Sequence, residues 1–289
     1  MKKYFLILCS ISILTITSCD IVEGPYITDS DSYINSDKKV LIEDFTGHLC
    51  TNCPEAAREI SAIHDLYGDQ IIALAIHVSA DYARPKNTNP DSSYHYDFRT
   101  EWGEEWDNIF GASAIGLPRG MVNRIGGQSP TLGKNEWASS VANELKKEID
   151  FKISIEADTN EITIASILEN TLDNDYNLVV CLAESNVINW QADGQNNIED
   201  YEHNHVLRSV VYDDKISNQS TLTRGAVVEN TFNINIKELE QYNILYSNNI
   251  EAGNGNAGGW NTNNMSVIAY IYNNITNEIV QVEEVPLNN

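Results

Sequence analysis

The sequence predicts an α/β domain followed by an all-β sandwich domain. In residues 38–150, apolar runs of strand length alternate with segments of helical periodicity. In residues 151–289, short alternating segments are separated by turns rich in Asn, Asp and Gly, a pattern typical of an antiparallel sandwich. A chain of 289 residues is long enough for two modest domains. Its composition, 42% hydrophobic and 21% charged, is typical of a globular protein.

The N-terminus has the pattern of an export signal. Lys2 and Lys3 form a basic region, and Tyr4–Ile16 is apolar but too short for a resident membrane helix. The small residues before Cys19 resemble the lipobox of bacterial lipoproteins. We therefore expect residues 1–18 to be a lipoprotein signal peptide and Cys19 to be lipidated, which would anchor the chain to a membrane. An ordinary signal peptide ending near a cysteine is the alternative.

Residues 19–37 are polar and are expected to form a lipidated, flexible tether. The formal net charge of the chain is −24, and no basic cluster offsets it. Such an acidic protein is repelled by nucleic acid, so we expect no nucleic-acid partner.

Several elements are expected between residues 38 and 150. Val40–Ile42 is a continuous apolar run, typical of a central strand covered on both faces. The later elements are a helix ending near Tyr67, a strand over Gln70–Val78, a loop over Ser79–Tyr96, a helix over Phe98–Phe110, a strand over Gly120–Arg124 and a helix over Glu136–Ile149.

A Cys-x-x-Cys pair stands at the start of the first of these helices, where Pro54 fits the first turn. A helix N-terminus favours the thiolate form of a cysteine, which is the reactive form. We interpret Cys50 and Cys53 as a redox-active pair that can form a disulfide, with Cys50 the exposed nucleophile and Cys53 the resolving thiol. A static structural disulfide, or half of a zinc site, remains an alternative.

The other three cysteines are not expected to take part in the redox pair. Cys9 leaves with the signal peptide and Cys19 carries lipid. Cys181 lies in an apolar strand pattern, so we expect a buried and inert thiol.

The second segment is expected to consist mainly of strands. They are Phe151–Ala157, Glu161–Leu168, Tyr176–Glu184, His205–Tyr212, Ala226–Ile236, Met265–Asn273 and Glu278–Val285. Lys237–Tyr242 fits one helical turn, and Gly253–Asn264 fits a loop in which Trp260 anchors its own segment or binds a ligand.

His203 and His205 lie two residues apart and would share one face of a strand. Together with Asp200 or Glu202 they could ligate a metal, but a third firm ligand is not evident in the sequence. A plain polar strand end is the preferred interpretation, so we predict no metal site and no cofactor.

The order of elements in residues 38–150 resembles the thioredoxin fold. The resemblance implies that Pro118, in Ile115-Gly-Leu-Pro118, is a cis proline that aligns a substrate chain. It also implies that Asp44, six positions before Cys50, is a buried carboxylate that assists proton transfer. The Thr51-Asn52 dipeptide between the cysteines departs from the usual Gly-Pro of that family.

A more specific resemblance covers most of the chain. The lipobox, the Glu43-Asp-Phe-Thr-Gly47 run, the Cys-x-x-Cys-Pro and the later His203-Asn-His-Val-Leu-Arg208 resemble the 28-kilodalton outer membrane protein family. The resemblance implies an outer-membrane lipoprotein of the cell envelope, with a thioredoxin-like domain followed by an immunoglobulin-like β domain. It does not indicate the leaflet.

Two functions follow as hypotheses. In the first, the protein performs thiol–disulfide exchange on exported proteins, with Cys50, Cys53, Asp44 and Pro118 at the site. In the second, it is a surface binding or adhesion lipoprotein that contacts a surface ligand, and the cysteine pair is a structural disulfide.

Overall fold

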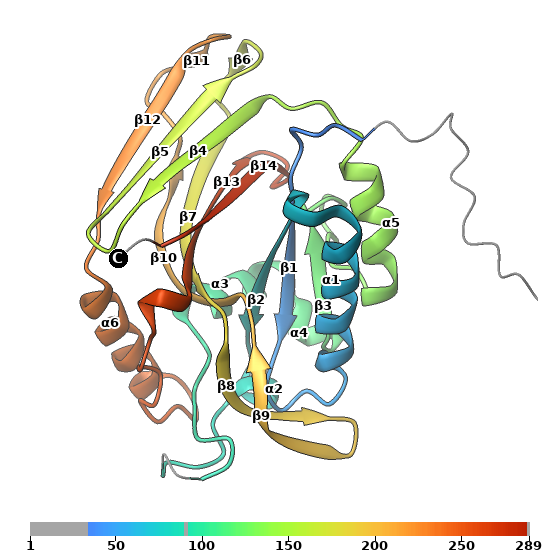
Figure 1. Cartoon of the computed structure of the whole chain (residues 1–289), viewed down its shortest axis with the longest axis vertical. Helices are drawn as coiled ribbons and strands as arrows, with labels where there is room; N and C mark the ends of the chain where they lie inside the picture. The colour runs from blue at the N-terminus through green and yellow to red at the C-terminus, as the bar shows by residue number, and fades with distance from the viewer. Residues whose placement is uncertain (1–33, 90–91, 288–289) are drawn as a thin grey trace, which may run out of the picture. The chain divides into compact units, whose positions relative to one another are not determined.

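A seven-stranded sheet organises the protein, which we describe from a computed structural model covering residues 34–89 and 92–287. The fold is mixed α/β, and the strand order in this sheet is β14-β13-β7-β10-β2-β1-β3 (Figure 1). The seven strands are β1 (Val40–Thr46), β2 (Ile71–His77), β3 (Arg119–Val122), β7 (Tyr176–Glu184), β10 (Val206–Lys215), β13 (Met265–Asn273) and β14 (Ile279–Pro286).

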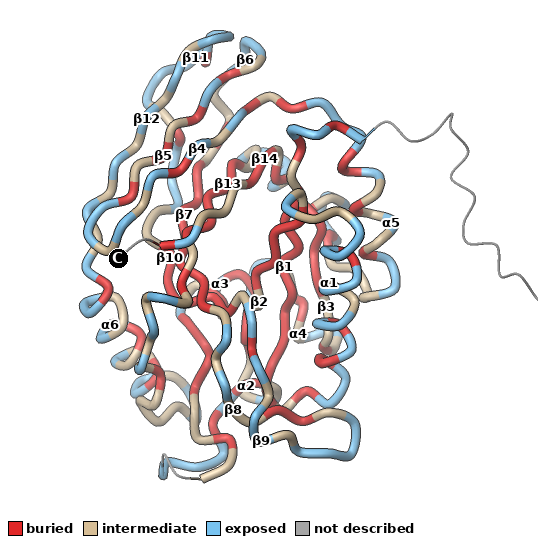
Figure 2. The backbone as a smooth tube through the Cα atoms, in the orientation of Figure 1, coloured by how far each residue is buried: buried red, intermediate tan, exposed pale blue. Residues whose placement is uncertain are grey.

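The middle strands are covered on both faces. Every residue of β1 is buried, as expected for the apolar run that begins at Val40 (Figure 2). β1 pairs in parallel with β2 and antiparallel with β3, so Asp44 lies opposite Ala75 on one side and Gly120 on the other. Side chains alternate along a strand, so Val40, Ile42 and Asp44 share one face of the sheet.

Strands from both sides of residue 150 share this sheet. β10 joins β2 in parallel through the pair Val206 and Ala75, and the amide of Ala75 donates to the carbonyl of His205 at 2.7 Å. One hydrophobic core contains Phe45 from the first segment and Tyr270 from the second. From Ile34 onward the described residues form one compact unit, so the boundary expected near residue 150 falls inside it.

Helices cover both faces of the β1–β3 part of the sheet. On one face, α1 (Cys53–Tyr67) lies beside α5 (Lys134–Glu144), whose Trp137 is fully buried (Figure 1). A Cβ atom on Gly120 would lie 2.5 Å from the Trp137 ring, so the glycine lets α5 approach β3. On the other face, Trp106 of α3 (Glu101–Phe110) and Ala112 of α4 (Ala112–Ile115) join the core around Phe45.

Helices in this part of the chain differ from the sequence prediction. α5 spans Lys134–Glu144 instead of the expected Glu136–Ile149. α3 begins at Glu101 instead of Phe98 because the Thr100 side chain accepts from the amide of Gly103 and caps the helix. A short helix, α2 (Ala80–Ala83), lies within the segment expected to be a loop, and Ser79 caps it by accepting from Asp81.

A second sheet packs against the β7 and β13 part of the first. It contains β12 (Val227–Asn233), β5 (Glu161–Leu168) and β4 (Phe151–Ala157), in that order. The bounds of β4, β5, β7 and β13 agree with the sequence prediction. α6 (Ile236–Asn249) is far longer than the single turn expected there, since neither glycine nor proline interrupts it. The two-residue strands β6 (Leu172–Asp173) and β11 (Thr221–Leu222) pair with each other.

A hairpin that the sequence interpretation missed consists of β8 (Val187–Asp193) and β9 (Asn196–His203). Asp193 pairs with Asn196 across a two-residue turn in which Gly194 has a φ of 59°. The two turn residues are Gly194 and Gln195, and glycine at the first position of a two-residue turn is a hairpin signal, so the sequence did carry this information.

The start of the described chain is bound to the fold. The amide of Asn35 donates to the carbonyl of Leu145 at 2.8 Å, and its side chain donates to the carbonyl of Lys147 at 3.1 Å. The flexible tether expected to extend to residue 37 therefore does not include residues 34–37. The predicted signal peptide of residues 1–18, Cys19 and the remaining tether lie outside the described residues.

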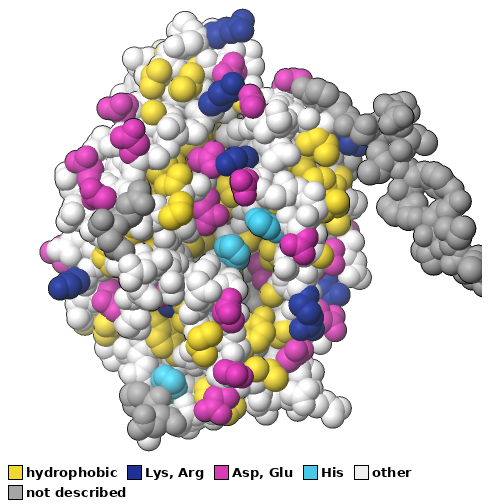
Figure 3. Space-filling model, viewed as in Figure 1, with side chains coloured by type: hydrophobic (Ala, Val, Ile, Leu, Met, Phe, Trp, Pro, Cys, Tyr) yellow, Lys and Arg dark blue, Asp and Glu magenta, His cyan; other side chains and the backbone are white. Residues whose placement is uncertain are grey.

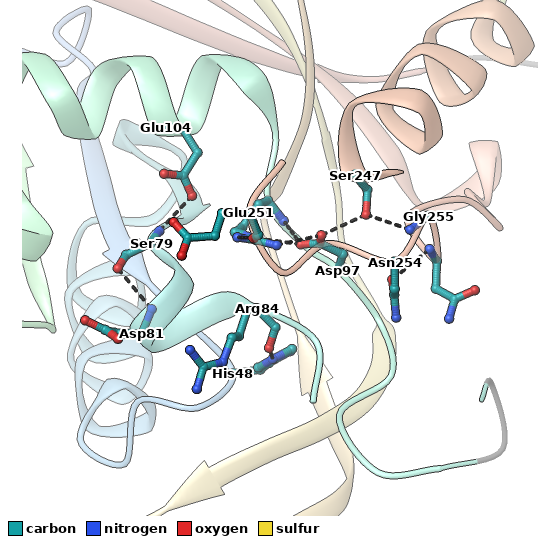
Figure 4. A network of polar contacts seen from close by, with 12 residues as sticks. His48, Ser79, Asp81, Arg84, Asp97, Glu104, Ser247, Glu251, Asn254 and Gly255 are labelled. Carbon is teal, nitrogen blue, oxygen red and sulfur yellow. Dashed lines mark hydrogen bonds and ion pairs between the residues drawn. The ribbon is translucent and has the colours of Figure 1, made fainter. Parts of the chain in front are cut away.

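A buried ion pair joins the segment before α3 to α6 and the loop that follows it (Figure 4). Arg99 donates two hydrogen bonds of 2.9 Å to Asp97, and both side chains are at most 1% exposed. Asp97 also accepts from Ser247 of α6, and Arg99 donates to the carbonyl of Glu251. In the same loop, Trp260 donates to the carbonyl of Ala257, which supports the expected anchoring role.

None of the helices in residues 34–89 and 92–287 is both long and apolar enough to cross a membrane.

Candidate functional site

The cysteine pair lies in the loop between β1 and α1 and forms a disulfide with a Cα–Cα distance of 5.4 Å. The helix begins at Cys53, not at Cys50 as the sequence interpretation expected. Cys50 belongs to the preceding turn, where its amide donates to the carbonyl of Gly47 at 3.0 Å. The disulfide therefore connects this turn to the first residue of the helix.

Gly47 lets a neighbouring segment approach this loop. A Cβ atom at Gly47 would lie 2.3 Å from the carbonyl oxygen of Tyr82 in α2. That same oxygen accepts from the amide of Leu49 at 2.9 Å. α2 therefore covers one side of the disulfide loop.

The β8–β9 hairpin covers the disulfide loop through backbone contacts. The amide of Ala192 donates to the carbonyl of His48, and the amide of Gly194 donates to the carbonyl of Thr51, both at 2.8 Å. The Gln191 side chain donates to the carbonyl of Cys50 at 3.1 Å.

As a result the cysteines are buried. Cys50 is 3% exposed and Cys53 is 2% exposed. The expectation that Cys50 is an exposed nucleophile is wrong for this structure, because segments far away in the sequence cover it.

Asp44 lies on the α1 face of β1 and is 3% exposed. Its Oδ1 atom is buried and has no hydrogen-bond partner among the described residues. Burial raises the pKa of this carboxyl to about 7, because the charged form loses its hydration. Asp44 is thus a buried carboxyl that can gain or lose a proton near neutral pH.

A cavity of about 400 Å³ brings Asp44 and Cys53 together. Its floor is the sheet, where Ala73 and Ala75 of β2 present small side chains toward α1. The β8–β9 hairpin and the turn after it contribute another wall, which includes Gln191. Small residues on the strand therefore leave room between the sheet and the helix, next to the disulfide.

Buried imidazoles lie beside this cavity. The His77 and His203 rings line it, and each has its centroid 4.6 Å from that of Phe98. His48 lies 5.7 Å from the same ring. Burial lowers the pKa of His48 to about 4, that of His203 to about 3 and that of His77 well below its usual value. These three imidazoles are therefore neutral at pH 7, and the sequence interpretation singled out only His203 among them.

The His203 and His205 pair does not share a strand face. β9 ends at His203, and His205 has a φ of 57° before β10 begins. Within residues 34–89 and 92–287, no group of three His, Cys, Asp or Glu side chains is placed to hold a metal ion.

Pro118 lies at the same end of the sheet as the disulfide loop. The Leu117–Pro118 peptide bond is cis, as the thioredoxin resemblance implied. Pro118 directly precedes β3, whose first residue, Arg119, pairs with Phe45 near the end of β1. Leu117 packs in the same core as both cysteines.

Cys181 is fully buried in β7, as expected. Its Sγ lies 3.6 Å from the carbonyl oxygen of Ile268, and burial raises the pKa of its thiol. It takes no part in the disulfide site.

On the face of the molecule drawn in Figure 3, histidine side chains are visible near the middle, among scattered acidic groups. His64 and His205 line the cavity, together with Arg58 and Glu202. Arg58 also forms an exposed ion pair of 3.2 Å with Asp193 of the hairpin.

Comparison with known proteins gives a family match and several fold matches. The model of the family described as outer membrane protein Omp28 matches residues 104–250, just over half of the chain. No curated protein matches the chain.

Three solved structures are similar. HBP35 of Porphyromonas gingivalis is 14% identical with a TM-score of 0.55, and the match covers 87% of this chain and 76% of that one. A structural genomics target from Agrobacterium tumefaciens is 13% identical with a TM-score of 0.50, covering 87% and 95%. A domain of the outer membrane lipoprotein Omp28 from Porphyromonas gingivalis is 18% identical with a TM-score of 0.25, covering 49% and 91%. At these identities the first two matches concern the fold alone.

Proposed function

The chain belongs to the Omp28 family of outer membrane proteins, and on this premise we propose that it carries out thiol–disulfide exchange through Cys50 and Cys53. Its membership of the family confirms the outer membrane localisation expected from the sequence. Anchoring through lipid on Cys19 is part of the proposal, as are a thioredoxin-like class for residues 38–150 and an immunoglobulin-like class for residues 151–289. The family match begins at residue 104, so the proposal for the cysteine pair rests on geometry.

The observation that carries the proposal is the shared cavity of Asp44 and Cys53. A buried carboxyl without a hydrogen-bond partner for one oxygen destabilises a fold. A structural disulfide has no use for such a group. Exchange chemistry does, because a carboxyl with a pKa of about 7 can accept a proton from a thiol and return it at neutral pH.

Thiol–disulfide exchange at this pair takes place in two steps. A thiolate attacks one sulfur of the disulfide, a mixed disulfide forms, and the other cysteine leaves as a thiolate. A second thiolate then attacks the mixed disulfide, releases the oxidised partner and leaves both cysteines reduced. Two electrons pass from the two thiols to the disulfide, and Asp44 holds or returns a proton near Cys53.

A second candidate is a binding protein in which the pair is a structural disulfide. The low exposure of both cysteines favours this function. Deleting residues 151–289 would not test it cleanly, because β7, β10, β13 and β14 belong to the same sheet as β1. The redox behaviour of the intact protein is the better discriminator.

The test is the reduction potential of the Cys50–Cys53 pair, measured by equilibration with glutathione buffers followed by thiol trapping. A value between roughly −270 and −120 mV, the range of known exchange proteins, supports the proposal. A value below about −300 mV would instead identify a structural disulfide and support the binding function. The Cys50→Ser variant is the control, because it cannot form the pair.

A further inference from the structure

The disulfide loop has little free backbone to offer a polypeptide partner. The carbonyls of His48, Cys50 and Thr51 accept from the β8–β9 hairpin, and the amide of Leu49 donates to Tyr82. A bound polypeptide strand pairs through main-chain groups of this kind. Here they are already paired within the protein, and Cys50 is 3% exposed.

The cavity offers a different approach to the same disulfide. The described residues that line the cavity include Cys53 but not Cys50. The space exists because Ala73 and Ala75 face Ala57 and Ser61 of α1 across it. Ser61 is exposed, so the cavity communicates with solvent along the helix.

The size and polarity of the cavity suit a small polar molecule. Its volume of about 400 Å³ lies near the lower end of the range of small-ligand sites, which is about 300–1,000 Å³. Neutral imidazoles such as His77 and His203 can donate or accept hydrogen bonds. Arg58 adds a cationic group at the wall. The lining therefore combines polar side chains with one residue of the disulfide, Cys53.

We propose that the exchange partner of the Cys50–Cys53 pair is a low-molecular-weight thiol, or the disulfide it forms, which enters this cavity and reacts at Cys53. This inference rests on the proposed function and specifies its substrate class. It differs from the expectation that exported proteins are the partners.

The reaction at Cys53 uses two molecules of the thiol. The first thiolate attacks Sγ of Cys53, the Cys50–Cys53 bond breaks, and Cys50 leaves as a thiolate. The second thiolate attacks the sulfur of the bound small molecule, a small-molecule disulfide forms, and Cys53 leaves as a thiolate. The small thiols are oxidised and the cysteine pair is reduced; the reverse sequence oxidises the pair.

The first experiment blocks the cavity and compares reductants on the whole 289-residue chain. Reduced glutathione and reduced thioredoxin serve as the small and the protein reductant. Ser61→Trp places a large ring at the cavity mouth, and Ala62→Trp places the same ring on the adjacent exposed position of α1, outside the lining. We expect Ser61→Trp to slow reduction by glutathione at least tenfold and Ala62→Trp to change it less than twofold.

The second experiment identifies the sulfur that a small molecule reaches. Single variants Cys50→Ser and Cys53→Ser are incubated with oxidised glutathione, and the mixed disulfide is located by peptide mass spectrometry. We expect Cys53 in the first variant to react at least tenfold faster than Cys50 in the second. This measurement remains informative even where a tryptophan variant fails to fold.

The outcomes separate the two claims. Faster reduction by thioredoxin than by glutathione, with no effect of Ser61→Trp, overturns the small-thiol inference and leaves exchange intact. Preferential reaction at Cys50 also overturns it. If neither reductant acts on the folded protein, exchange itself is wrong and the small-thiol inference falls with it.

Discussion

Gln191 donates a hydrogen bond to the carbonyl oxygen of Cys50, which lies 141 positions earlier in the chain. This contact connects the β8–β9 hairpin to the turn that carries the first cysteine. It places the exposure of the disulfide under the control of a hairpin that belongs to the other half of the sequence.

Loosening the hairpin turn should make the disulfide more accessible to a protein. Gly194 has a φ of 59°, so Gly194→Ala should destabilise the turn by about 1 kcal/mol. If a protein reductant needs the hairpin to open, its rate should rise about fivefold, as that energy implies. The measurement is the rate of reduction by thioredoxin.

Gly225→Ala is the matched control. Gly225 has a φ of 78° and also has open space around its Cα, but it lies between β11 and β12, away from the disulfide loop. The Gly225→Ala variant should lower the stability as much as Gly194→Ala does, without changing the rate of reduction by thioredoxin. Equal acceleration in both variants would mean that global unfolding, and not the hairpin, exposes the disulfide.

Replacing Asp44 should stabilise the protein, and more so at high pH. The pKa of Asp44 is raised to about 7 when folded, so the unfolded chain loses this proton first as pH rises from about 4. The stability linked to Asp44 is therefore complete below pH 4 and is lost as pH rises through 7. We expect Asp44→Asn to raise the free energy of unfolding at pH 8 by about 2–4 kcal/mol, measured by urea denaturation.

The Asp158→Asn variant is a control in which the change in stability should have the opposite sign. Backbone amides of Asn160 and Glu161 donate to Asp158 and lower its pKa, so its charged form favours the folded state. This variant should lower the stability at pH 8. A gain at pH 8 no larger than at pH 4 for Asp44→Asn would contradict the raised pKa.

The buried imidazoles should make the protein less stable in acid. His77 stacks on Phe98, and its pKa is well below its usual value because of burial. Between that value and about 6.5, the unfolded chain binds a proton that the folded chain does not, so stability falls as pH decreases. Each such histidine contributes a slope of about 1.4 kcal/mol per pH unit within its window.

His77→Phe should therefore flatten the dependence of unfolding free energy on pH between about 4.5 and 6 by up to that amount. Tyr201→Phe is the control, because Tyr201 contacts His203 in the same cluster but carries no imidazole. The opposite slope from Asp44 is present in both variants and cancels in the comparison. An unchanged slope in His77→Phe would refute the assignment of a neutral imidazole.

The Asp97→Ala variant, which lacks the carboxylate, should be severely destabilised. Arg99 would keep its charge at 1% exposure without its partner, and such a change typically costs about 3–5 kcal/mol. Lys134→Ala, which breaks the more exposed pair with Glu55, should cost less than about 1 kcal/mol. Chemical denaturation of both variants measures the difference; similar losses would show that the Asp97–Arg99 pair does not hold α6 in place.

The sequence predicted those elements that depend on short-range signals. The apolar run from Val40, the proline at position 54 and the alternating strands β4 and β5 are each encoded within a few residues. The role of Asp44 near the cysteine pair was implied by a family resemblance. In the structure, Asp44 and Cys53 line the same cavity.

The features of the fold and of the site that the sequence did not predict depend on contacts between distant residues, which local patterns do not encode. The burial of Cys50 comes from the β8–β9 hairpin, and the cavity comes from Ala73 and Ala75 lying opposite small residues of α1. Alternation along a strand reveals which face a residue occupies, but not what packs on that face. Of these features, only the turn at Gly194-Gln195 has a local sequence signal.

The parallel contact between Val206 and Ala75 has a consequence for how the protein is made. β2 is translated long before β10, so during synthesis and export its outer edge has no partner. An uncovered edge strand is a template for pairing with other chains. Closing so long a stretch of chain is also slow compared with local pairing. The nascent protein therefore needs protection from aggregation until its second half arrives, and a chain truncated after α5 would need that protection permanently.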